Sequence, residues 1–116
     1  MLQENDKHLA RAEVLIQQGR LRDAEKEVRQ ALHADPQSHK ALAALGRVYI
    51  DGKRPAEGIP LISQAIGLCP DEDYYLYLRA FGYYQLNLHT AAEQDVMQAI
   101  ALNPWNAGYF ALHAFI

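Results

Sequence analysis

The chain has 116 residues, of which half are hydrophobic and 22% are charged, with a net charge of −3 and one cysteine. This composition predicts one folded domain, and the lack of a basic stripe or basic amphipathic face excludes nucleic-acid binding and direct membrane insertion. Cys69 cannot form an intrachain disulfide, and the N-terminus lacks a secretory hydrophobic region, so the sequence predicts a cytoplasmic protein.

Prolines divide the chain at a constant interval. Pro36, Pro70 and Pro104, in "HADP", "GLCP" and "ALNP", are 34 residues apart. Residues of matching size recur at the same interval before each proline, which indicates a structural repeat. Three of the matching columns are Ala12, Gly46 and Ala80; Val28, Ile62 and Val96; and Ala31, Ala65 and Ala99.

In chain order, each unit is predicted to form two helices. Gly19 in "QQGR" and Gly52 in "IDGK" end the first helix of units one and two, as glycine commonly does. Each proline follows a second helix, which it cannot continue, and polar residues after it cap the next helix. In unit two Pro60 lies near the start of the second helix, where we expect an irregular helix start.

The third unit shows both helical stripes. Leu76, Ala80 and Tyr83 recur at the spacing of one helix face and are predicted to be core. After a break at "NLHT", a second stripe begins with Ala92 and Val96. The columns of small residues allow the two helices of a unit to approach closely, so the pattern predicts an all-α protein of antiparallel helix pairs.

A 34-residue helix–turn–helix with these large, small and proline positions resembles the tetratricopeptide repeat (TPR) family. The resemblance covers one domain, 1–116, with repeats 5–38, 39–72 and 73–106 and a partial fourth repeat or capping helix at 107–116. It implies a right-handed superhelical stack of about seven helices, an α-solenoid. It also implies a scaffold or adaptor that binds a protein or peptide segment in its concave groove.

An aromatic cluster falls in the third unit. Tyr74, Tyr77, Phe81 and Tyr84 lie in an arc of roughly 80°, turned away from the predicted core stripe. In TPR proteins that face of the first helix lines the concave groove, so the resemblance assigns these rings to peptide binding. The competing interpretation is that they are packing residues, some of them covered by the fourth-unit helix.

The same register supplies the rest of the predicted groove, with Lys40 and Arg47 as a basic patch that could meet a ligand carboxylate. One TPR subclass binds the acidic C-termini of heat-shock chaperones through a clamp of lysine, arginine and asparagine. The clamp positions hold Leu9, Glu13, Ala44, Tyr74 and Leu78 here, so no such cochaperone activity is predicted. The other predicted groove residues are Ile50, Asp51, Gln85, Leu9, Glu13 and Gln17, with Asp6, Ile16 and Ala43 beside them.

No catalytic or cofactor motif is found in the sequence. The five histidines lack metal-ligand spacing, Cys69 has no activating arrangement, and the glycines do not form a phosphate loop. We therefore predict no enzyme activity, no cofactor and no metal. Two alternative roles stay open: a small secretion-type chaperone for an apolar client segment, and the substrate-recruiting region of a larger enzyme.

The last stretch, "NAGYFALHAFI", begins a fourth first helix and is almost entirely apolar from Tyr109 onward. Terminal repeats usually present a polar outer face. We expect either a fragment of a longer array, which this rule favours, or an end that a partner or a second copy covers. Self-association through this helix could accompany any of the proposed roles.

Overall fold

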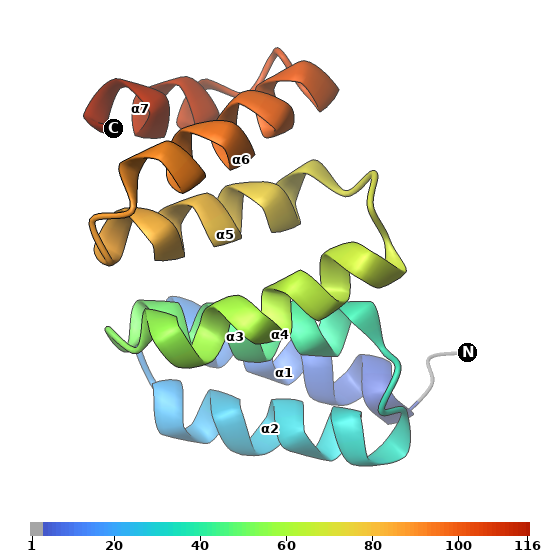
Figure 1. Ribbon diagram of the computed structural model, residues 1–116. Coiled ribbons are helices and arrows are strands. Elements are labelled where there is room, and N and C mark those ends of the chain that lie inside the picture. The colour runs from blue at the N-terminus through green and yellow to red at the C-terminus, as the bar shows by residue number, and fades with distance from the viewer. Residues whose placement is uncertain (1–3) are drawn as a thin grey trace.

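The computed structural model describes residues 4–116, so the first three residues of the predicted domain lie outside the described part. Within it the chain forms helices and no strand, and the helices pack as successive antiparallel pairs (Figure 1). The predicted all-α stack is confirmed. Its helices are α1 (Glu4–Gln17), α2 (Leu21–Ala34), α3 (His39–Asp51), α4 (Pro55–Leu68), α5 (Asp73–Gln85), α6 (His89–Leu102) and α7 (Ala107–Phe115).

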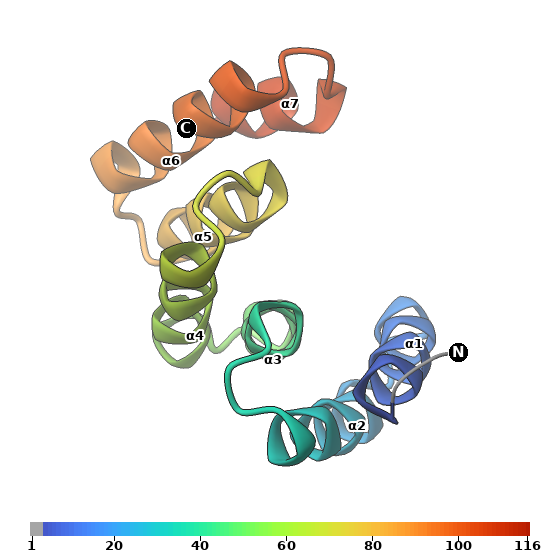
Figure 2. The ribbon, with the colours of Figure 1, turned by 90° about the vertical axis from the view of Figure 1, so that its right-hand side faces the viewer.

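The pairs stack into a curved array. Each first helix packs mainly on its own second helix, and each second helix then contacts the first helix of the next unit. Figure 2 shows the result: α1, α3, α5 and α7 lie toward the open side of the curve, and α2, α4 and α6 form its outer side. None of the helices in residues 4–116 combines the length and apolarity that crossing a membrane requires.

Helix ends repeat with the same 34-residue spacing because the same local geometry recurs. Gly19, Lys53 and Asn87 have φ of 76°, 63° and 60°, the left-handed conformation that commonly ends a helix. The following amide donates back to the carbonyl five residues earlier, as Arg54 does to Tyr49 at 2.7 Å. In unit two Gly52 caps the end of α3, as predicted, but with φ −84°. The left-handed residue of this unit is the next one, Lys53.

The small-residue column permits a close contact between α3 and α4. A Cβ placed on Gly58 would lie 2.6 Å from the carbonyl oxygen of Gly46, so no side chain fits there. The prediction of an irregular start for the second helix of this unit is wrong. Helix α4 begins at Pro55 in its first turn and continues without interruption through Pro60 to Leu68.

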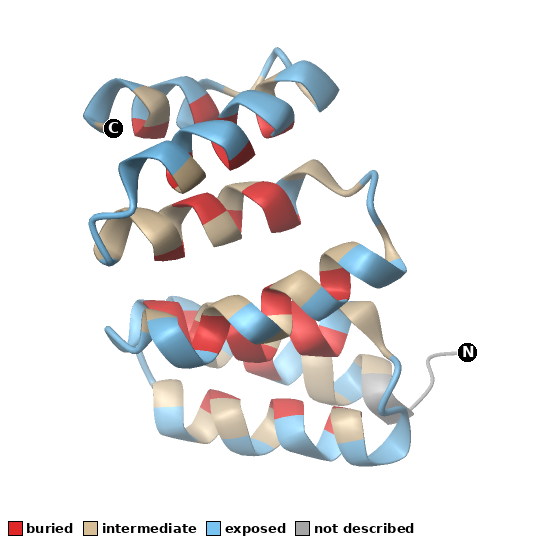
Figure 3. Cartoon of the chain, viewed as in Figure 1, coloured by how far each residue is buried: buried red, intermediate tan, exposed pale blue. Residues whose placement is uncertain are grey.

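The core runs between the helices, and their outward faces are exposed (Figure 3). Leu76 and Ala80 are buried against α6 as predicted, but Tyr83 is not core: its ring is half-buried, with the Arg79 guanidinium 5.9 Å from the ring centroid. Tyr49, one repeat earlier, is buried in the apolar cluster between α2 and α3, and its hydroxyl donates to Glu25 on α2 at 2.9 Å. The position equivalent to Glu25 on α4 is an isoleucine, which cannot hold Tyr83 in the same way.

An ion pair joins α5 and α6 at the position that Leu45 occupies in unit two. Arg79 donates from Nε and Nη2 to the two carboxylate oxygens of Asp95, at 2.7 and 2.9 Å, and from Nη1 to Ser63 Oγ at 3.2 Å. The Asp95 side chain is 7% exposed. The hydrogen bond to Asp95 is the main cause that raises the pKa of Arg79, which keeps the guanidinium charged.

Candidate functional site

Two adjoining hollows lie on the inner side of the curve. The α1 hollow encloses about 220 Å³ between α1, α3 and α5. The α5 hollow encloses about 180 Å³ between α3 and α5, and both hollows share Arg47, Tyr74 and Leu78. The α1 hollow is lined by Leu9, Glu13, Ile16, Lys40, Ala43, Ala44, Arg47, Tyr74, Tyr75 and Leu78; the α5 hollow is lined by Arg47, Ile50, Asp51, Tyr74, Tyr77, Leu78 and Phe81.

The hollows form because the repeat places the same helix face of α1, α3 and α5 toward one side. Positions 34 residues apart, such as Leu9 and Ala43 or Glu13 and Arg47, therefore become neighbours across the array. Apolar and aromatic side chains supply most of the walls, and a few polar groups supply the rest, as in many ligand sites. The arrangement can receive the side chains of a chain segment that lies along the curve.

Arg47 is neutralised within the groove. Its Nη1 donates to both carboxylate oxygens of Glu13 at 3.1 Å, and its Nε lies 3.7 Å from Asp51 Oδ2. Burial raises the pKa of the Asp51 carboxyl above its usual value, and the Arg47 charge partly opposes this effect. The predicted basic patch is therefore centred on Lys40, an exposed residue that lines the α1 hollow.

The aromatic cluster of α5 contains stacked rings, and the stacking continues onto α7. The Tyr74 and Tyr77 rings stack with centroids 6.2 Å apart, and Tyr77 stacks on Tyr109 of α7 at 5.1 Å. Tyr109 in turn donates its hydroxyl to Asp73 Oδ2 at 2.6 Å, which fixes α7 against the start of α5. Tyr74 is 37% exposed, whereas Tyr77 and Phe81 are half-buried, so packing and groove lining are both served by the same rings.

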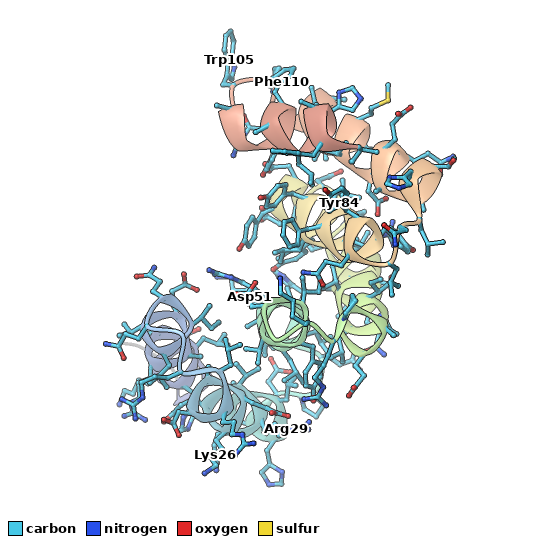
Figure 4. The ribbon with its side chains drawn as sticks, turned by 90° about the vertical axis from the view of Figure 1, so that its left-hand side faces the viewer. Lys26, Arg29, Asp51, Tyr84, Trp105 and Phe110 are labelled. Carbon is cyan, nitrogen blue, oxygen red and sulfur yellow. The ribbon has the colours of Figure 1, made fainter. Side chains whose placement is uncertain are left out.

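Besides Asp6, three predicted groove residues lie outside both hollows. Gln17 is exposed and donates to Glu13 at 3.2 Å, whereas Gln85 donates its Nε2 to the buried Ile50 carbonyl at 3.1 Å and ties α5 to α3. Tyr84 lies near the end of α5, with its ring 6.2 Å from that of His89 (Figure 4). These side chains support neighbouring groups and do not line the groove cavities.

Three lining residues, Ala44, Tyr75 and Leu78, were not among the predicted groove residues. Tyr75 is buried at 6% exposure, lines the α1 hollow and is hydrogen-bonded through its hydroxyl to His39 Nδ1 at 2.8 Å. Burial raises its pKa to about 12. Ala41 and Tyr109 at the equivalent repeat positions are also buried, but the first member of this column is Lys7, so the sequence column gave no uniform apolar signal.

A metal-ion site is not formed among the described residues: no three histidine, cysteine, aspartate or glutamate side chains cluster suitably there. Comparison with known families gives a direct assignment. A family model described as tetratricopeptide repeat matches residues 9–73, more than half of the chain. The chain belongs to the TPR family.

Solved TPR structures superpose closely on this TPR domain. The first TPR domain of Spaghetti (RPAP3) bound to the HSP90 peptide SRMEEVD gives a TM-score of 0.90 at 16% identity, covering 97% of this chain and 89% of that one. The P58(IPK) TPR domain gives 0.86 at 22% identity, over 96% of this chain and 32% of that one. The Yersinia enterocolitica type III secretion translocator chaperone SycD gives a TM-score of 0.83 at 16% identity, covering 99% of this chain and 87% of that one. At these identities the likeness establishes the fold alone, and no curated protein sequence matches the chain.

Proposed function

We propose that this TPR domain is a non-enzymatic interaction module that binds a segment of another protein along its concave groove. The observation that carries the proposal is the pair of adjoining, largely apolar hollows joined at Tyr74 and Leu78. The proposal is supported by the RPAP3 domain, which has the same fold and is bound to a peptide in its solved structure. A scaffold or adaptor role in the cytoplasm, without nucleic acid, agrees with the composition.

The lining favours an apolar side chain as the anchor of the bound segment. The five positions that correspond to the carboxylate clamp of chaperone-binding TPR domains all line the α1 hollow, and none of them is a cation. Arg47, a half-buried cation of the groove, is already held by Glu13 and Asp51. Lys40, an exposed residue that lines the α1 hollow, is the cation that a carboxylate of the bound segment could pair with beside the apolar anchor.

Peptide selection tests the proposal. Twelve-residue random peptides displayed on phage are selected on the domain, and fluorescence anisotropy measures the dissociation constant of the selected peptides. We expect them to contain a large apolar residue and to bind at roughly micromolar concentrations, whereas labelled SRMEEVD binds more weakly than about 1 mM. Tight binding of SRMEEVD would contradict the apolar-anchor assignment.

Two tyrosines on α5 provide a matched pair of variants. Tyr74→Ala removes a ring that lines both hollows and should weaken the selected peptides about tenfold or more, because aromatic anchors dominate such interfaces. Tyr83→Ala removes a half-buried ring outside both hollows and should change binding less than about twofold. Equal losses in the two variants, with both folded by circular dichroism, would place the peptide outside the groove.

A secretion-type chaperone is a second candidate function. The match to SycD, over most of both chains, favours it because that protein is a translocator chaperone. In this role the groove would hold an apolar segment of a client and keep it soluble. Co-expression with an aggregation-prone client fragment separates the two roles: a chaperone raises the soluble yield of the client, and Tyr74→Ala removes that gain.

A further inference from the structure

Helix α7 presents an apolar stripe to solvent. The exposed residues Ala107, Phe110, Ala111, Ala114 and Phe115, here named the α7 face, follow the spacing of one helix side. Figure 4 shows Phe110 and the adjacent Trp105, which is 90% exposed, pointing away from the stack. A continuous apolar face of this kind marks an interaction surface more often than it marks an idle one.

The repeat register indicates what kind of surface fits the α7 face. Helix α7 begins 34 residues after α5, so Phe110 and Ala114 correspond to Leu76 and Ala80. Those two residues are 2% and 0% exposed because α6 packs antiparallel against them. The α7 face is thus the side by which a first helix in this array contacts an antiparallel helix.

The absence of charge points to an identical chain as the source of that helix. Asp95 is the last charged residue, and residues 96–116 contain no aspartate, glutamate, lysine or arginine. Near a two-fold axis a side chain comes close to its own copy, so a charge at that place would meet a like charge. A face without charges meets this condition.

We propose that a second copy of this chain packs its α7 antiparallel on the α7 face across a two-fold axis. With Ala111 near the axis the helices can approach closely, and Phe115 of each copy lies opposite Ala107 of the other, large against small. Trp105, Phe110 and Phe115 together give a buried area on the order of 1,000 Å² in total, which is typical of weak, reversible association. The groove between α1, α3 and α5 stays open in this dimer.

Sedimentation velocity from roughly 1 to 100 µM tests the dimer. The average mass should rise toward twice that of the chain over this range. Ala111→Glu and Ala111→Lys change an exposed residue and place like charges at the axis, so each variant alone should associate about 100-fold more weakly. An equimolar mixture of the two variants should regain the dimer, because opposite charges then meet.

Ala56→Glu is the matched control, because it adds the same charge at an exposed position of α4 and should leave association unchanged. Three results would overturn the proposal: a constant monomer mass, a dimer that is insensitive to Ala111→Glu, or a mixture no stronger than either variant. A chain that stays monomeric but binds an added amphipathic helix through the α7 face would assign that face to a different partner.

Discussion

Replacing Arg79 with leucine tests how α5 and α6 are held together. In unit two the equivalent positions of Arg79 and Asp95 are Leu45 and Leu61, which pack in the same apolar cluster. Unit three uses a bidentate ion pair at the same place. Arg79→Leu removes the cation and leaves the Asp95 carboxylate, 7% exposed, without its partner. The double variant Arg79→Leu/Asp95→Leu copies unit two.

The two variants should differ widely in stability. Breaking a buried ion pair from one side costs about 3–5 kcal/mol, and the lower end applies because the Arg79 side chain is 22% exposed. Arg79→Leu should therefore lose about 3 kcal/mol of unfolding free energy and roughly 12 °C in melting temperature. The unfolding free energy of the double variant should lie within about 1 kcal/mol of that of the wild type, because well-packed leucines can replace a buried ion pair with little loss of stability.

Urea unfolding followed by circular dichroism at 222 nm measures these differences. Arg11→Leu is the matched control in the same repeat column, because Arg11 is exposed and lies 3.7 Å from Glu27. It should change stability by less than about 0.5 kcal/mol, as surface ion pairs do. The reasoning fails if Arg79→Leu costs no more than Arg11→Leu, or if the double variant is as unstable as Arg79→Leu alone.

Three further predictions concern backbone geometry and pH, and urea unfolding measures each of them. Gly58→Ala should lose about 2 kcal/mol because its Cβ would meet the Gly46 carbonyl at 2.6 Å, and an unchanged stability would disprove that contact. Lys53→Gly should gain about 0.5–1 kcal/mol by relieving a left-handed residue, whereas Gly19→Ala should lose about 1 kcal/mol. Burial raises the pKa of Tyr75 from its ordinary 10 to about 12, so its contribution to stability is complete below pH 10 and is lost as the pH rises toward 12. Tyr75→Phe should flatten that decline, and an equal slope in both proteins would refute this assignment.

Much of the architecture follows from the sequence because helix boundaries depend on local signals. The proline interval and the small-residue columns predicted the paired helices, and α3, α5 and α7 begin 34 residues apart. The same register placed Tyr74, Tyr77 and Phe81 toward the inner side, where they line the hollows. Whether they bind a peptide stays a prediction that the proposed variants can test.

Other properties were decided only by contacts between units. The sequence presents Arg47 as a free cation, but α1 brings Glu13 to within 3.1 Å of it and removes that charge from the groove. Tyr83 matched Tyr49 in register and was predicted to be core, yet its neighbours on α4 do not bury it. A helix pattern determines which way a side chain points, because that depends on its own backbone. Its burial and its charge partner depend on helices far away in the sequence, so only the tertiary structure decides them.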